Sequence, residues 1–235
     1  MSKYYDILMK DYRLQEGLKA CINCGTCTAI CPAAEFYKYN PKNIVNIVQS
    51  KDDEAIEELL KSDVIWYCGE CMSCVTRCPR KNAPGLVIMA LRKLSIDTGF
   101  FTESEKGRQQ YPLAKVLCQN ILEHGYCVHP TTFKYAAHPE YGTVGKWIEE
   151  NLEDVYARVG AVYGQDAVGA LRKIPQESID DLHRIFDITG ATEQVNHIYE
   201  ESLKKAEEMG LTEEEYFYQT FNITSDKHLN HDIRR

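Results

Sequence analysis

A mainly α-helical fold is predicted for this chain of 235 residues, and three features of its sequence predict it. Apolar residues recur at helical spacing, as in Ile56, Leu59 and Leu60, with Glu and Lys between them. Alternating apolar and polar residues, the usual sign of a half-buried strand, are nearly absent. Several periodic segments are bounded by Pro or Gly, residues that start or stop helices.

The overall composition restricts the classes of partner and compartment. Hydrophobic residues make up 44% of the chain, which allows a real core, and the formal net charge is −8. Because nucleic-acid binding needs clustered Lys and Arg, this balance argues against a nucleic-acid partner. No stretch approaches the ~18–20 consecutive apolar residues that span a bilayer, and the first residues lack the apolar segment of a signal peptide. We therefore expect a cytoplasmic protein without a transmembrane segment.

Residues 1–100 are predicted to form one helical domain around two runs of cysteines. A short amphipathic helix is expected within residues 1–20, and Asn40-Pro41 marks a turn. Residues 43–50 and 52–62, between the two cysteine runs, are predicted helices. The segment that begins at Pro84 and Gly85 is apolar on all sides, so we expect a buried helix there.

Residues 101–235 are predicted to form a helical extension that docks a partner. A polar stretch at 102–110 marks the boundary, and residues 127–142 are expected to be irregular. From Thr143 onward the pattern is helical, with one apolar stripe, and the last fourteen residues are polar and expected to be extended. The stripe consists of Val144, Ile148, Leu152, Val155 and Val159. Further helices are predicted at 113–124, 175–189, 192–209 and, with capping-box spacing of Thr212 and Glu215, up to Phe221.

Eight of the ten cysteines fall in two runs of identical spacing. The first is Cys21-x2-Cys24-x2-Cys27-x3-Cys31-Pro32, and the second is Cys68-x2-Cys71-x2-Cys74-x3-Cys78-Pro79. This is the spacing that bacterial ferredoxins use to hold [4Fe–4S] clusters. Each iron corner of such a cluster needs one soft thiolate, and three cysteines at two-residue intervals can wrap one loop around it. The sequence therefore predicts two [4Fe–4S] clusters.

The fourth cysteine of each run is expected to serve the other cluster, because it follows on a diverging chain. The predicted ligands of the first cluster are Cys21, Cys24, Cys27 and Cys78, and those of the second are Cys68, Cys71, Cys74 and Cys31. Gly25 and Gly69 lie inside the loops, where they can let backbone amides approach the sulfides.

Two other uses of the cysteines fit the spacing less well. Zinc ligands usually come as two separated C-x2–4-C pairs, whereas here four cysteines fall within eleven residues and are followed by Pro. Disulfides are expected in short secreted chains rather than in a long chain without an export signal. Because residues 32–67 between the runs are predicted helices, the arrangement indicates an α-helical ferredoxin domain rather than a compact β-rich one.

On these residues the chain resembles the C-type subunit of heterodisulfide reductase over residues 15–100. The resemblance rests on Ala20-Cys21-x-x-Cys24-Gly25-Thr26-Cys27-Thr28-x-x-Cys31-Pro32 and on Ile65-Trp66-x-Cys68-x-x-Cys71-x-x-Cys74-x-x-Arg77-Cys78-Pro79-Arg80. It implies an electron conduit between a flavin-containing A-type subunit and a catalytic B-type subunit with CCG motifs. No Cys-Cys-Gly occurs here, so this chain is expected to be a non-catalytic subunit. The helical extension is more similar to heterodisulfide reductase-like complexes of bacterial sulfur oxidation.

Alternative functions stay open at this point. One is a free-standing ferredoxin-type carrier, and another is the iron–sulfur subunit of a glycolate oxidase-like, succinate dehydrogenase-like or fumarate reductase-like enzyme. The succinate dehydrogenase type would carry an earlier [2Fe–2S] domain, which is not expected because no cysteine precedes Cys21. Cys118 is interpreted as a small core residue and Cys127 as part of a turn that contacts a partner, with a third metal site as the alternative.

Overall fold

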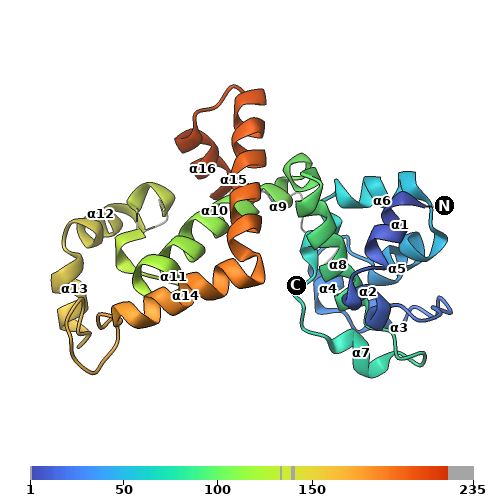
Figure 1. Cartoon of the computed structure of the whole chain (residues 1–235), viewed down its shortest axis with the longest axis horizontal. Helices are drawn as coiled ribbons and strands as arrows, with labels where there is room; N and C mark the ends of the chain where they lie inside the picture. Colours follow the sequence, from blue (N-terminus) through green and yellow to red (C-terminus); the bar gives the residue numbers. More distant parts are fainter. Residues whose placement is uncertain (1, 133, 139–140, 222–235) are drawn as a thin grey trace. The chain divides into compact units, whose positions relative to one another are not determined.

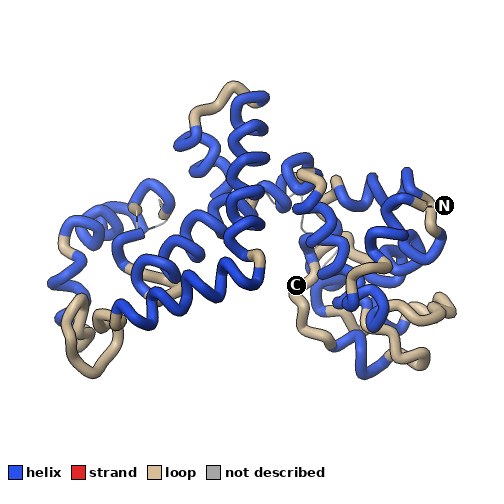
Figure 2. The backbone as a smooth tube through the Cα atoms, viewed as in Figure 1, coloured by secondary structure: helices blue, strands red, loops and turns tan. Residues whose placement is uncertain are grey.

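The computed structural model describes residues 2–132, 134–138 and 141–221, and this part of the chain contains helices and loops without a β-strand (Figure 2). The chain divides into two compact units, one that extends to Arg108 and one that begins at Gln109. The boundary predicted between residues 100 and 101 stays a prediction. The fold class is confirmed: the chain is mainly helical, and its cysteine runs precede a helical region.

The first unit holds both cysteine runs, and most of its helices are short (Figure 1). In order they are α1 (Lys3–Leu8), α2 (Tyr12–Gly17), α3 (Thr26–Ala29), α4 (Pro32–Phe36), α5 (Pro41–Ser50), α6 (Asp53–Leu60), η1 (Val64–Tyr67), α7 (Ser73–Arg77), α8 (Pro84–Asp97), η2 (Phe100–Glu103) and α9 (Glu105–Arg108).

Helix α8 is the centre of the first unit, as the apolar sequence after Pro84 predicts. Nine of its residues are buried, among them Val87, Ile88 and Leu91 with no exposed surface. The helices α1, α2, α5, α6 and α7 all contact it. The buried hydroxyl of Ser95 donates a hydrogen bond of 2.7 Å to the carbonyl of Leu60, which fixes α8 to the end of α6. The core of the cysteine-bearing unit is therefore built around one apolar helix.

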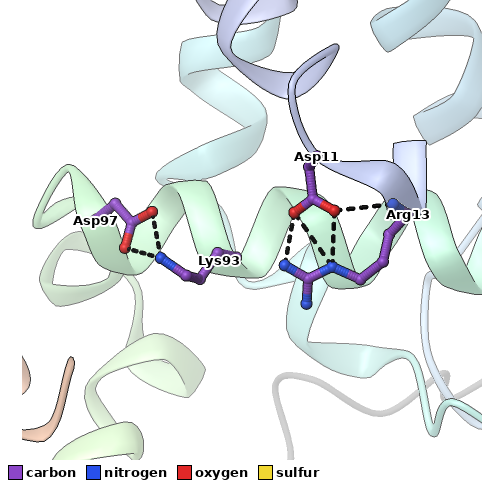
Figure 3. A network of polar contacts seen from close by, with 4 residues as sticks. All are labelled: Asp11, Arg13, Lys93 and Asp97. Carbon is purple, nitrogen blue, oxygen red and sulfur yellow. Dashed lines mark hydrogen bonds and ion pairs between the residues drawn. The ribbon is translucent and has the colours of Figure 1, made fainter. Parts of the chain in front are cut away.

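Two short helices replace the single helix predicted within residues 1–20. The break falls at Asp11, whose extended backbone and side-chain hydrogen bond to the Arg13 amide cap the start of α2. The carboxylate of Asp11 also faces the Arg13 guanidinium, next to an ion pair of Lys93 with Asp97 on α8 (Figure 3). These four charges alternate in sign, so they favour the position of α2 along α8.

Capping residues explain where α5 and α6 begin. The predicted turn at Asn40-Pro41 is the start of α5: the Asn40 side chain accepts a hydrogen bond from the Asn43 amide, and Pro41 is the first helical residue. Asp52 caps α6 in the same way through the amides of Glu54 and Ala55. Both helices then bury one apolar side against the core.

The second unit has helices of its own, and its position relative to the first is not determined. Its elements are α10 (Gln110–Leu113), η3 (Ala114–Cys118), α11 (Gln119–His124), η4 (Pro130–Thr132), η5 (Tyr135–Ala137), α12 (Gly142–Glu150), α13 (Leu152–Arg158), α14 (Gln176–Thr189), α15 (Ala191–Glu208) and α16 (Glu213–Phe221). The elements α10, η3 and α11 follow one another directly, with a π-helical turn in the middle and the left-handed Gly125 at the end. This run matches the helix predicted at 113–124.

Buried aromatic residues hold α16 against α10. Tyr111 and Tyr216 are almost fully buried, and their ring centroids lie 5.6 Å apart. The Tyr111 hydroxyl donates a hydrogen bond of 2.7 Å to the Glu213 carboxylate, which is also paired with Lys115. The predicted capping box of α16 is confirmed, since the Glu215 carboxylate accepts from the Thr212 amide at 2.8 Å.

The apolar stripe predicted from Thr143 onward is not one continuous buried face. The helix ends at Asn151, whose backbone leaves the helical region, and a second helix starts at Leu152. Val144 and Val159, at the two ends of the stripe, are 60% and 72% exposed. The prediction for residues 222–235 lies outside the described residues. None of the helices in the described ranges combines the length and apolar character that a bilayer crossing needs.

Candidate metal centre

Cysteines from both runs line a first hollow in the first unit. Three of them, Cys21, Cys24 and Cys27, belong to the first run, and the fourth is Cys78, from the end of the second run. Pro79 lines the same hollow, so the residue that follows the crossing cysteine also reaches the neighbouring loop.

A second hollow has the reciprocal lining. Cys68, Cys71 and Cys74 come from the second run, and Cys31 with Pro32 comes from the end of the first. The short helices α3 and α7, one from each run, pack against each other. The structure thus brings together the same two sets of four cysteines that the sequence predicts as ligand groups.

The loops around the two hollows share a left-handed residue at the same position. Gly25 has φ 81° and precedes α3, and Met72 has φ 57° and precedes α7. Gly suits this backbone, whereas Met strains it. Gly69, the second glycine singled out in the sequence, does not adopt a positive φ. The Met72 side chain packs closely on the start of α8: a Cβ atom added to Gly85 would lie 2.9 Å from the Met72 sulfur.

Backbone amides and hydroxyls approach the first two sulfurs of each run in a repeated pattern. In each run an amide two residues later points to the first sulfur, and a hydroxyl two residues later contacts the second. These pairs are Asn23 N to Cys21 Sγ at 3.4 Å, Glu70 N to Cys68 Sγ at 3.4 Å, Thr26 Oγ1 with Cys24 Sγ at 3.3 Å and Ser73 Oγ with Cys71 Sγ at 3.4 Å. The amides donate to sulfur, and once the thiol is ionised each hydroxyl can donate to it too; such donors stabilise a thiolate, which is the form that binds metal.

The thiols divide into two groups by their surroundings. The Thr26 and Ser73 hydroxyls lower the pKa of the exposed Cys24 and Cys71 thiols, because a hydrogen bond favours the charged sulfur. Burial raises the pKa of Cys27, Cys31 and Cys74, because the apolar surroundings disfavour the charge. Each hollow therefore has one exposed thiol with a lowered pKa, Cys24 or Cys71, and at least one partly buried thiol with a raised pKa.

Two side chains that the sequence did not single out hold the first cysteine of each run. Gln49 of α5 accepts from the Cys21 amide at 2.9 Å and donates to the Cys21 carbonyl at 3.3 Å. Arg92 of α8 donates to the carbonyls of Ile65 at 2.8 Å and Cys68 at 2.6 Å, and pairs with Glu70 at 2.6 Å. No local pattern in the sequence marks either residue, because each acts on a cysteine more than twenty residues away.

A third missed residue, Asn82, joins the two ends of the site. It is buried, and its side-chain oxygen accepts from the Lys19 amide at 2.6 Å. Its own amide points to Cys78 Sγ at 3.3 Å. Asn82 thus connects the chain just before the first run to the last cysteine of the second run, and it lines the first hollow.

The electrostatic surroundings of both hollows suit an anionic occupant. Helices α5 and α8 begin there: Lys42 and Pro84 line the first hollow, and Pro41 and Gly85 line the second. Helix N-termini carry partial positive charge. The first hollow also has two cationic lining residues, Lys42 and Arg80, whereas no charged side chain lines the second.

The geometry of the cysteines suits a cluster better than a single ion. Within the described residues, no three His, Cys, Asp or Glu side chains are arranged to hold one metal ion. Four thiols spaced around a hollow match the four corners of a cubane, each of which takes one thiolate. In the second hollow, the buried Tyr39 hydroxyl makes no hydrogen bond of regular geometry in the described chain and lies near the Cys68 sulfur, so it is available to a thiolate or a bound group there.

The remaining two cysteines belong to the second unit, and neither lines a hollow. Cys118 is half-buried in the π-helical turn, and Cys127 is exposed. Burial raises the pKa of the Cys118 thiol, consistent with its interpretation as a packing residue. Trp66 of η1 packs against the core and lies 5.5 Å from the Arg92 guanidinium carbon; it lines neither hollow.

A helical fold with two such cysteine sets defines a protein that carries two [4Fe–4S] clusters. Residues 17–82 match the family model described as a 4Fe-4S dicluster domain, which spans both cysteine runs. The two predicted clusters are thereby confirmed as the cofactors of this chain.

The curated relatives of this segment are C-type subunits of heterodisulfide reductases. The C-type subunit of the ferredoxin:CoB-CoM heterodisulfide reductase of Methanosarcina acetivorans is 45% identical over 87 residues, which are 37% of this chain and 34% of the relative. The iron-sulfur C2 subunit of the CoB--CoM heterodisulfide reductase of Methanocaldococcus jannaschii is 32% identical over 98 residues, 42% of this chain and 50% of the relative. A protein of Archaeoglobus profundus described as similar to the C-type subunit is 38% identical over 81 residues, 34% of this chain and 41% of the relative. The chain thus spans half or less of the length of these three relatives.

Proposed function

We propose that this chain is the iron–sulfur electron-transfer subunit of a heterodisulfide reductase-like complex. In this proposal it carries electrons between a flavin-containing subunit and a catalytic subunit with CCG motifs, and has no catalytic residue of its own. The observation that carries the proposal is the lining of each hollow by four cysteines from both runs. The similarity of the N-terminal part to the C-type subunits of heterodisulfide reductases supports the choice of complex.

We propose that the cluster ligands cross between the runs. The ligands of the first cluster are then Cys21, Cys24, Cys27 and Cys78, and those of the second are Cys68, Cys71, Cys74 and Cys31. When bound, each [4Fe–4S] cluster supplies a centre that takes up and releases a single electron. The chain contributes the thiolates, the amide and hydroxyl donors around them, and an apolar core that excludes water from the buried sulfurs.

The second unit is proposed to dock a partner subunit. It lies outside the dicluster match, and it exposes large apolar side chains such as Ile188, at 86%. Aromatic residues such as Phe217 and Tyr218, which are half-buried on α16, offer further contact area. A narrower proposal assigns the complex to bacterial sulfur oxidation, because the helical region beyond residue 100 departs from the C-type subunits of methanogens. A reducing cytoplasm is the proposed location, since thiolate-bound clusters persist there.

Spectra of serine variants test the crossed ligands. Cys31→Ser should lose the cluster of the second run, so its EPR spectrum after dithionite reduction should match that of Cys68→Ser. Cys78→Ser should match Cys21→Ser for the same reason. Iron and sulfide analysis of each anaerobic preparation checks that one cluster remains. If Cys31→Ser matches Cys21→Ser instead, each run holds its own cluster and the crossing is wrong.

Anaerobic purification from the native source tests the role in a complex. A tagged full-length chain should retain a flavin-containing protein and a protein with CCG motifs, identified by flavin fluorescence and mass spectrometry. A chain recovered alone at native concentration, with both clusters intact, would favour the free-standing ferredoxin-type carrier. Partners of the glycolate oxidase or fumarate reductase class would favour the other oxidoreductase alternative.

A further inference from the structure

Tyr39 occupies a position at the second hollow that the cysteine pattern does not explain. It follows α4 and directly precedes Asn40, the capping residue of α5. Its ring packs at 88° to the ring of Tyr67, with centroids 6.3 Å apart. Tyr67 in turn stacks on Tyr37 at 4.8 Å, so the Tyr39 ring is held by an aromatic group and has little freedom to turn.

The hydroxyl of Tyr39 is buried and makes no hydrogen bond of regular geometry in the described part of the chain, and the nearby sulfur is that of Cys68. The residue is 5% exposed, and water has no access to its oxygen. An unpaired buried hydroxyl is costly, and buried tyrosines usually have a partner. Tyr39 lines the second hollow together with Cys31, Cys68, Cys71 and Cys74, so the missing acceptor is expected in that hollow.

We propose that the Tyr39 hydroxyl donates a hydrogen bond to a sulfur at the second cluster site, either Cys68 Sγ or a sulfide of the bound cluster, and thereby raises the reduction potential of that centre alone. This inference rests on the proposed cluster ligands. A phenol is protonated at neutral pH, so it can donate. A donor to sulfur favours the reduced state, which carries one more negative charge. No proton is transferred in this role.

The first hollow lacks such a donor. Its lining has no tyrosine, and besides the amide and hydroxyl contacts described above it has the cationic side chains of Lys42 and Arg80. The two linings thus differ in that the second has a buried tyrosine hydroxyl and the first has two cationic side chains. Removal of the Tyr39 hydroxyl should therefore change one of the two potentials and leave the other as it is.

Tyr39→Phe is the test, because it removes the hydroxyl and keeps the ring. Iron and sulfide content should equal that of the unmodified chain, whereas an EPR-monitored redox titration should show a lower midpoint potential for one signal. That signal should be the one absent from Cys31→Ser and Cys68→Ser. Tyr37→Phe, which changes a neighbouring ring that lines neither hollow, should leave both potentials unchanged.

A second measurement detects the proton itself. Pulsed EPR of the reduced protein in H₂O and D₂O should reveal an exchangeable proton coupled to the second centre, and Tyr39→Phe should lack it. Unchanged potentials, equal shifts of both centres, or persistence of that coupling in Tyr39→Phe would overturn the role of Tyr39. Loss of iron in the unmodified chain would instead overturn the proposed cluster binding, so the two failures are distinguishable.

Discussion

Replacement of Arg92 by Lys should loosen the second cluster selectively. The Arg92 guanidinium bonds the carbonyls of Ile65 and Cys68 and the carboxylate of Glu70, and its side chain is only 18% exposed. A hydrogen bond from a charged donor contributes about 1.5–3 kcal/mol. The pair with Glu70, which is 40% exposed, is discounted to less than about 1 kcal/mol. Lysine keeps the charge but lacks the planar fork, so it cannot make both carbonyl bonds as Arg92 does.

The loss of one such bond should lower the free energy needed to open the loop around Cys68 by about 2 kcal/mol. That corresponds to a roughly thirtyfold increase in the equilibrium constant for local opening. We expect iron to leave the second site up to about thirtyfold faster in the presence of a chelator, followed by the decay of its EPR signal. Gln49→Leu is the matched variant at Cys21 and should loosen the first site instead. Lys93→Gln, which breaks an exposed pair on the same helix, should change neither. The reasoning is refuted if Arg92→Lys retains the second cluster as well as the unmodified chain does, or loses both clusters at one rate.

Three further predictions concern the first unit. Gly17→Ala should lower the free energy of unfolding of the first unit by about 1–3 kcal/mol, because the new Cβ would lie 3.0 Å from the Ala83 carbonyl oxygen. An unchanged thermal midpoint would show that α2 can move away from α8. The Arg13 guanidinium lowers the pKa of Asp11 in the folded state. The ionised Asp11 therefore stabilises the folded protein above about pH 4, and this contribution is lost as the pH falls through the lowered pKa. Urea unfolding should therefore show a deficit for Asp11→Asn at pH 7 that shrinks toward pH 3, and a pH-independent deficit would contradict this. Lys42→Gln should lower the midpoint potential of the first centre, most at low ionic strength, while a shift of the second centre would argue against the local effect of this charge.

The sequence predicts those features that depend on residues close together in the chain. The spacing of the cysteines, the buried helix after Pro84 and the capping box at Thr212 are all local patterns, and the structure has the helix and the capping box where they were expected. Gln49 and Arg92 act on cysteines 28 and 24 residues away, so no local pattern reveals them. Tyr39 is one of fifteen tyrosines, and what distinguishes it is a buried hydroxyl at the second hollow, which only the folded structure reveals.

The apolar stripe after Thr143 shows the opposite case, in which a regular pattern is overridden. Its spacing fits one long helix, yet the chain leaves the helical conformation at Asn151, a residue type with weak helix propensity. The valines at both ends of the stripe remain exposed, so the described residues provide no apolar surface that fully covers them. Periodicity predicts which side of a helix is apolar, but the surface that buries it is decided by the rest of the fold.

The reciprocal lining of the two hollows has a consequence for how the protein is made. During synthesis, the loop from Cys21 to Cys27 leaves the ribosome well before Cys78, so the first hollow stays one sulfur short until the second run has emerged. The second hollow has its Cys31 early but must wait for Cys68, Cys71 and Cys74. With the proposed crossed ligands, neither metal centre can be completed on a nascent chain that ends before residue 74. Insertion of iron is therefore tied to the release of nearly the whole first unit, and a fragment that lacks either run should complete neither centre.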